Sequence, residues 1–271
     1  MRSTKFSQLT NKLICSGALI VCVLAPYAGA LPVEGIVTPT TVPARAAQSQ
    51  NLPLVCTELD PGSLGAAGGK SLFWKNKSEL RVRFLNGSEA LQAQVRRYAS
   101  IWNNYTRLPF VFVESGPSDI RVSFTHDGSS WSYIGKSAEG VSVNKPTMNF
   151  GWFDGTTTED NFRGTILHEF GHGLGLIHEH LSPAAVIHWN KPKVYEYYDT
   201  HFGWNENLVN RNIFEKYGGR RTKFTPYDPT SIMHYPIPAE LTTDGTSVAW
   251  NTNLSSIDKA FAEKEFKAMN K

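Results

Sequence analysis

The clearest alternation of apolar and polar residues lies in residues 79–85. Leu80, Val82 and Phe84 alternate there with two arginines, which predicts a β-strand with one buried face. Residues 88–105 instead repeat apolar side chains at helical spacing, and Ser88 is placed to cap the first turn. The apolar face of this predicted helix consists of Leu91, Val95, Tyr98 and Trp102.

Short apolar runs predict further strands at residues 110–113, 119–124 and 147–151. The stretch between the last two strands is rich in Gly and Ser and reads as loop. Residues 31–70 are rich in Pro, Thr, Ala and Gly and show neither a helical nor a strand period. That composition favours a flexible leader or a propeptide.

The strongest motif is HEFGHGLGLIHE, which begins at His168. Positions four apart share one face of an α-helix, so His168 and His172 point the same way, with Glu169 beside them. Gly175 can adopt the left-handed conformation that ends helices, which would let the chain turn and return His178 to the same point. Three protein ligands that leave one position for water are typical of catalytic zinc. We therefore predict one Zn²⁺ per chain, held by His168, His172 and His178.

An ordinary buried helix, whose histidines hydrogen-bond within the core, is the alternative interpretation of this segment. Three glycines argue against it, because each lowers helix stability by about 1 kcal/mol relative to alanine. A segment that conflicts with its local propensity usually does so for function or for close packing. His180 is the alternative third ligand. The remaining histidines are expected on the surface or in the core: His126, His188, His201 and His234.

A second segment, SIMHY around Met233, extends the pattern. Together the two segments resemble the metzincin zinc peptidases, and Glu179 directly after the third histidine makes the chain similar to the astacin family among them. The resemblance runs from about Leu72 to the C-terminus. It implies an α+β, zincin-like catalytic domain over residues 71–271, with a twisted mixed β-sheet, an active-site helix and an irregular C-terminal subdomain.

The resemblance also implies an activity, that of a zinc metalloendopeptidase acting on protein or peptide substrates. Glu169 would serve as general base on a zinc-activated water, and Tyr235 would hydrogen-bond the developing oxyanion. Relatives place an exposed edge strand between residues 124 and 148, where an extended substrate can pair. A surface loop with Trp131 and Tyr133 folded onto the core is the other interpretation of that stretch.

Some positions depart from the family pattern. The chain lacks the usual two disulfides, Leu176 stands where phenylalanine is common, and residues 180–185 replace an arginine-rich stretch. In astacins the residue at Glu179 pairs with the processed N-terminus. In this chain its partner could instead be a buried Arg or Lys.

Two other functions stay open at this point. One is a secreted, non-catalytic zinc-containing protein that binds peptides, although zinc binding alone needs neither Glu169 nor Tyr235. The other is a serralysin-like peptidase, a group that usually has proline after the third histidine and glycine-rich calcium repeats downstream. This chain has Glu179 at that position and no such repeats.

Residues 1–30 have the features of a signal peptide: a basic start, an apolar run and small residues for cleavage. The whole chain has 27 basic and 24 acidic residues, and this segment holds three basic and no acidic ones, so 24 of each remain. No basic stripe is left to suggest nucleic acid, and no other segment could cross a membrane. We expect a secreted, extracellular protein that is monomeric.

Cys56 is the one cysteine outside the signal segment, so the mature chain has no internal disulfide. A domain of this size can bury a sufficient core without one. Family propeptides often block the zinc with an aspartate or a cysteine, which makes Cys56 and Asp60 the candidates here. A free linker cysteine is the alternative.

Overall fold

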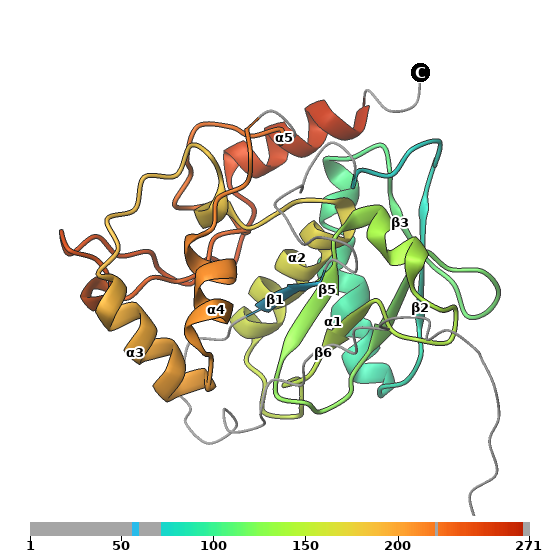
Figure 1. Ribbon diagram of the computed structural model, residues 1–271. Helices are drawn as coiled ribbons and strands as arrows, with labels where there is room; N and C mark the ends of the chain where they lie inside the picture. The colour runs from blue at the N-terminus through green and yellow to red at the C-terminus, as the bar shows by residue number, and fades with distance from the viewer. Residues whose placement is uncertain (1–55, 60–71, 220–221, 268–271) are drawn as a thin grey trace, which may run out of the picture. The chain divides into compact units, whose positions relative to one another are not determined.

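The computed structural model describes residues 56–59, 72–219 and 222–267. The predicted signal peptide, Asp60 and most of the leader at residues 31–70 lie outside these residues. The described chain forms a six-stranded sheet with the order β1-β5-β6-β4-β2-β3. Figure 1 shows α1 and α2 packed against this sheet, with α3 and α4 away from it. Within the described residues, no helix is long and apolar enough to span a bilayer.

All neighbouring strands run parallel except β5 and β6, which are antiparallel, so the sheet is mixed, as the resemblance implies. The strands are β1 (Cys56–Leu59), β2 (Leu80–Phe84), β3 (Phe110–Phe112), β4 (Ile120–Ser123), β5 (Ser130–Tyr133) and β6 (Met148–Phe150).

The strands all lie before α2, with α1 between β2 and β3, and the chain after α2 is helical or irregular. The helices are α1 (Glu89–Ala99), α2 (Glu159–Leu174), α3 (Lys191–Phe202), α4 (Glu206–Val209) and α5 (Ser256–Lys267). Short 3₁₀ segments are η2 (Trp102–Asn104), η3 (Gly135–Gly140), η4 (Glu179–Leu181) and η6 (Ala239–Leu241), and η5 (Asn210–Phe214) is a π-helical turn.

The predicted first strand and helix are present, with a shorter helix. In β2, Leu80 and Val82 are fully buried. The side chain of Ser88 accepts a hydrogen bond from Leu91 N and caps α1, as predicted. The helix ends at Ala99 rather than near residue 105, and the chain continues into η2. Trp102 nevertheless reaches the core, because its Nε1 donates to Leu167 O of α2 at 3.0 Å.

Two separate apolar cores support the domain. The larger lies between the sheet, α1 and α2, with Trp102, Phe150 and Phe170 fully buried in it. The smaller gathers the aromatic side chains of α3 and the segments around it, including Tyr198 and Trp204. The C-terminal subdomain is mostly irregular, as expected, but α3, α4 and α5 are regular elements that the sequence pattern did not reveal.

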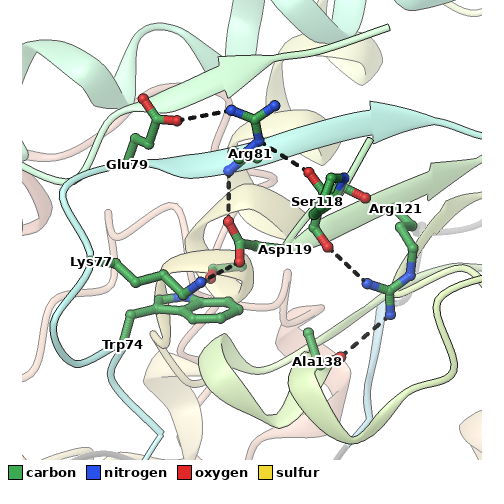
Figure 2. Close-up of polar contacts among 10 residues, drawn as sticks. Trp74, Lys77, Glu79, Arg81, Ser118, Asp119, Arg121 and Ala138 are labelled. Atoms are coloured by element: carbon green, nitrogen blue, oxygen red, sulfur yellow. Dashed lines mark hydrogen bonds and ion pairs between the residues drawn. The ribbon is translucent and has the colours of Figure 1, made fainter. Parts of the chain in front are cut away.

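A polar network fixes the segment that leads into β2. Figure 2 shows Asp119 accepting hydrogen bonds from Lys77 Nζ at 2.6 Å and Arg81 N at 2.8 Å. Nearby, Arg121 donates to the carbonyls of Ser118 and Ala138. These bonds tie the start of β2 to β4.

Strand β1 was not predicted, because residues 31–70 show no strand period. It pairs in parallel with β5, with Cys56 opposite Ser130 and Leu59 opposite Tyr133. The prediction of an exposed edge strand is therefore corrected. Strand β5 exists at the expected place, but a piece of the leader covers its outer edge.

Candidate active site

The chain turns at the end of α2, at the glycine where the sequence predicted it. Gly175 has a φ of 115°, in the left-handed region that favours glycine. Gly175 N donates to His172 O at 2.8 Å, and Leu176 N donates to Gly171 O at 3.0 Å. These bonds satisfy carbonyls that the last helical turn would otherwise leave unpaired. The reversal returns His178 toward the helix.

The imidazoles of His168, His172 and His178 converge on one point. Their Nε2 atoms lie 3.2 Å apart in all three pairs, and the side chains are buried. A tetrahedral zinc ion with Zn–N distances of about 2.05 Å separates its nitrogen ligands by about 3.3 Å. Within the described residues, this is the one cluster of His, Cys, Asp or Glu side chains able to hold a metal.

Hydrogen bonds at the far side of two rings orient them for a metal. His168 Nδ1 lies 2.7 Å from Ile232 O, and His172 Nδ1 lies 2.9 Å from Leu176 O. A carbonyl oxygen only accepts, so each Nδ1 carries the hydrogen and each Nε2 keeps its lone pair for the centre. Burial, with the charges of His168 and His234, holds the pKa of His178 well below its usual value. Neutral imidazoles are what zinc ligation requires.

The two residues predicted for catalysis lie beside this cluster. Glu169 follows His168 on α2 and is fully buried. The ring of Tyr235 is 4.3 Å from that of His178 and 6.3 Å from that of His168, measured between centroids. The structure thus places the Tyr235 ring against the three imidazoles, with Glu169 next to His168 along α2.

Met233 lies against the helix that carries the first two ligands. A Cβ on Gly171 would come within 2.4 Å of Met233 Sδ, so only glycine permits this approach. Met233 O also accepts a hydrogen bond from Glu179 N at 2.9 Å. The methionine turn therefore braces both α2 and the segment that carries the third ligand.

Glu179 lies in a small cavity of about 50 Å³ lined also by Phe73, Asp228 and Asp258. Its Oε1 accepts a hydrogen bond from Asp228 N at 3.0 Å. Burial raises the pKa of Glu179 to about 7, and the neighbouring carboxylates add to that shift. Lys216 lowers this pKa by its charge, but its ammonium donates to the carbonyls of Ala185 and Ser182.

His180 does not replace His178 in the cluster. Its Nε2 lies 2.9 Å from Asn212 O, and its ring stacks on Tyr235 with centroids 4.6 Å apart. His126 and His188 are exposed. His234 is buried, with its ring nitrogens 2.6 Å from Tyr235 O and 2.8 Å from Tyr227 Oη.

Sequence reasoning missed two residues that brace the site from outside the motifs. Trp74 Nε1 donates to Gly173 O at 2.8 Å and so holds the last turn of α2. Asp258 of α5 accepts hydrogen bonds from Ser231 Oγ and Ile232 N in the methionine turn. A signal for Asp258 existed, because Ser255 and Asp258 have capping-box spacing. No local pattern marked Trp74.

Comparisons with known proteins agree with this geometry. Residues 69–256 match the family model described as "Astacin", which represents a peptidase family. A solved structure titled "Structure of myroilysin" is 43% identical, covers 74% of this chain and 98% of that one, and superposes with a TM-score of 0.71.

Curated relatives give the same result over a shorter span. "Zinc metalloproteinase nas-38" of Caenorhabditis elegans is 28% identical over 52% of this chain. "Matrix metalloproteinase-19" of Homo sapiens is 33% identical over 48% of it. The match spans only 17% and 27% of those two proteins. The predicted resemblance, the fold class and the zinc cofactor are confirmed.

Proposed function

This chain belongs to the astacin family and is a zinc metalloendopeptidase, and from that premise we propose that it is a secreted enzyme in which Glu169 is the general base. The observation that carries the proposal is the buried triangle of His168, His172 and His178. In the proposal these three Nε2 atoms hold the zinc. The family match favours this function over a serralysin-like one.

Bound zinc would lower the pKa of a water molecule and polarise the scissile carbonyl. Glu169 would take the proton of that water and deliver it to the departing amine. The position of Glu169 supports this role, since it follows His168 on the same helix and is fully buried. A buried carboxylate close to a metal is well placed to move one proton without competition from bulk water.

Tyr235 would donate its phenolic hydrogen to the oxyanion that develops on the substrate carbonyl. Support comes from its ring, which packs 4.3 Å from His178 and 4.6 Å from His180. Both neighbours restrict the directions in which the phenol can move. The tyrosine would therefore act from a defined side of the metal.

The outer edge of β5 would bind the backbone of an extended substrate. The parallel pairing of β1 with β5 supports this, since it demonstrates that the edge accepts another strand. We assign residues 31–70 to a propeptide whose strand β1 covers this edge until the propeptide is removed. Cys56 and Asp60 remain the candidates for a group that blocks the zinc.

The cavity beside Glu179 would receive the N-terminus formed by that removal, as the family resemblance implies. Phe73, close to the start of the domain, lines the same cavity. The carboxylates of Glu179 and Asp228 offer a new ammonium group an acidic environment. We expect the mature domain, residues 71–271, to be monomeric and extracellular, with residues 1–30 removed as a signal peptide and no nucleic-acid partner.

The test is degradation of an unfolded protein by the secreted chain and by Glu169→Ala, with bound zinc measured in both. Loss of the general base should lower kcat roughly 10²–10⁴-fold while zinc stays bound. Glu159→Gln, at the exposed start of the same helix, is the matched control and should retain activity. The activity should also disappear with a chelator and return with zinc.

Equal activity of Glu169→Ala and the native chain would contradict the assigned general base. If neither cuts, repeating the assay without residues 31–70 separates a latent enzyme from a non-catalytic peptide-binding protein. Continued inactivity after that trimming would favour the binding protein.

A further inference from the structure

Asp258 lies on α5, far along the chain from the zinc motif and two residues beyond the family match, which ends at residue 256. Its side chain is buried, yet it is a carboxylate. Burial raises the pKa of Asp258, while hydrogen bonds from Ser231, Ile232 and Ser255 act against that shift. A buried carboxylate is costly unless it is paired or hydrogen-bonded, so its partners show which parts of the chain it holds in place.

The bonds of this carboxylate all go to fixed parts of the chain. Oδ1 accepts from Ser231 Oγ at 2.7 Å, and Oδ2 accepts from Ile232 N at 2.8 Å and Ser255 N at 2.9 Å. Ser255 Oγ in return accepts from Asp258 N at 2.9 Å, which completes a capping box at the start of α5. The helix start therefore holds the carboxylate rigidly against the methionine turn.

A continuous line of hydrogen bonds joins this carboxylate to a zinc ligand. His168 Nδ1 donates to Ile232 O at 2.7 Å, and the N–H of the same peptide group, at Met233, donates to Ser231 Oγ at 3.1 Å. Ser231 Oγ then donates to Asp258 Oδ1 at 2.7 Å. Every donor in this line points away from the metal and toward the negative charge.

We propose that Asp258 is a positioning residue whose charge, relayed through Ser231 and the Ile232–Met233 peptide group, orients and strengthens His168 as a zinc ligand. Metal-bound histidines commonly give their second N–H to a carboxylate or carbonyl, which fixes the tautomer and increases ligand basicity. Hydrogen bonds in series polarise one another, so a carboxylate at the end of the line makes the Ile232 carbonyl a better acceptor. The proposal rests on the assignment of His168 as a ligand in the proposed function.

The experiment measures the zinc dissociation constant of the full chain by competition with a chromophoric chelator. Asp258→Asn should weaken zinc binding about 10–100-fold, the range typical of lost outer-shell partners. Ser231→Ala should weaken it in the same direction, and Ser231→Thr, which keeps the hydroxyl, should restore it. The visible absorption spectrum of the Co²⁺-substituted Asp258→Asn and Ser231→Ala variants should shift, because the ligand field that His168 exerts on the metal changes.

Asn251→Ala is the matched control, since Asn251 Nδ2 donates to Pro229 O and Ser231 O, both at 2.9 Å, and braces the same turn outside the relay. It should lower the melting temperature without changing zinc affinity or the Co²⁺ spectrum. If Asn251→Ala weakens zinc as much as Ser231→Ala does, the turn acts through packing alone and the relay is wrong. Native zinc affinity in Asp258→Asn and Ser231→Ala would overturn it as well.

Two further comparisons keep these outcomes distinct. Should Asp258→Asn fail to fold, the pair Ser231→Ala and Ser231→Thr decides the question alone. His168→Ala tests the underlying assignment, because native zinc affinity in that variant would refute His168 as a ligand. A loss of zinc in His168→Ala with native binding in Ser231→Ala would leave the proposed function intact and refute only the relay.

Discussion

The sheet-based half of the domain and the half that follows Gly175 hold their parts of the active site differently. In the first half one regular helix, α2, sets the positions of His168, Glu169 and His172 through its own periodicity. In the second half His178 and Tyr235 lie outside regular α-helices and strands. Hydrogen bonds between side chains and the main chain stabilise that backbone. They are made by the side chains of Asp228, Asp258, Asn251 and His180.

The comparison teaches that one metal site can position its ligands in two ways, by regular helix geometry and by specific polar contacts. The backbone hydrogen bonds of a helix already place its ligands at the correct spacing, so only the ring orientation of His168 and His172 needs outside partners. Ligands on irregular backbone need specific polar partners, and each lost partner leaves a buried group unsatisfied. The second half should therefore be the more sensitive to loss of the metal and of single hydrogen bonds.

Removal of zinc should have the largest effect, and it should affect the two halves of the domain differently. Chelation should abolish activity and increase amide hydrogen exchange more in residues 176–182 and 231–235 than in β2 and β4. The reason is that zinc would join His178 to α2, whereas the sheet keeps its apolar core without it. Exchange mass spectrometry of the native and chelated chain measures this. A uniform rise across both halves would contradict the distinction.

Tyr235→Phe tests the catalytic contribution of the irregular half. Loss of one oxyanion donor should lower kcat roughly 10²–10³-fold while zinc content stays the same. Tyr195→Phe is the control in the same half, since it loses only an exposed hydrogen bond to Asn210 at 2.7 Å. Steady-state kinetics of both variants decide the matter, and native kcat in Tyr235→Phe would remove the tyrosine from the mechanism.

Gly171→Ala tests the contact where the two halves meet. The added Cβ would lie 2.4 Å from Met233 Sδ, so the variant should lose about 1–3 kcal/mol of stability through overpacking. Gly140→Ala meets nothing within 4 Å and should be neutral or slightly stabilising. Denaturant unfolding of both variants gives the comparison, and equal stability would mean that the methionine simply moves aside.

Trp74→Phe should have the smallest effect, because it removes one hydrogen bond from a region rich in packing. Losing the bond from Nε1 to Gly173 O should cost about 1 kcal/mol of unfolding free energy. Trp152→Phe is the control, since Trp152 Nε1 is buried without a hydrogen-bond partner in the described structure. If both substitutions cost the same, ring packing and not the bond to α2 explains the loss.

Local patterns in the sequence predicted the regular half well. Alternation predicted β2, helical spacing with a capping serine predicted α1, and the zinc motif with Gly175 predicted the turn that returns His178. These features depend on residues within a few positions of one another. The end of α1 was placed too late because Trp102 continues the apolar spacing, although it reaches α2 from a 3₁₀ turn.

By itself the sequence predicted the chemistry of the site: three imidazoles, one carboxylate and a turning glycine from the motif, and one phenol from the family resemblance. Only the tertiary structure decided which distant groups support that chemistry. Asp258 meets the Ser231–Ile232 peptide from α5, Trp74 meets Gly173, and β1 covers β5. Such contacts join segments through the topology of the whole domain, and no periodicity over a few residues can encode them.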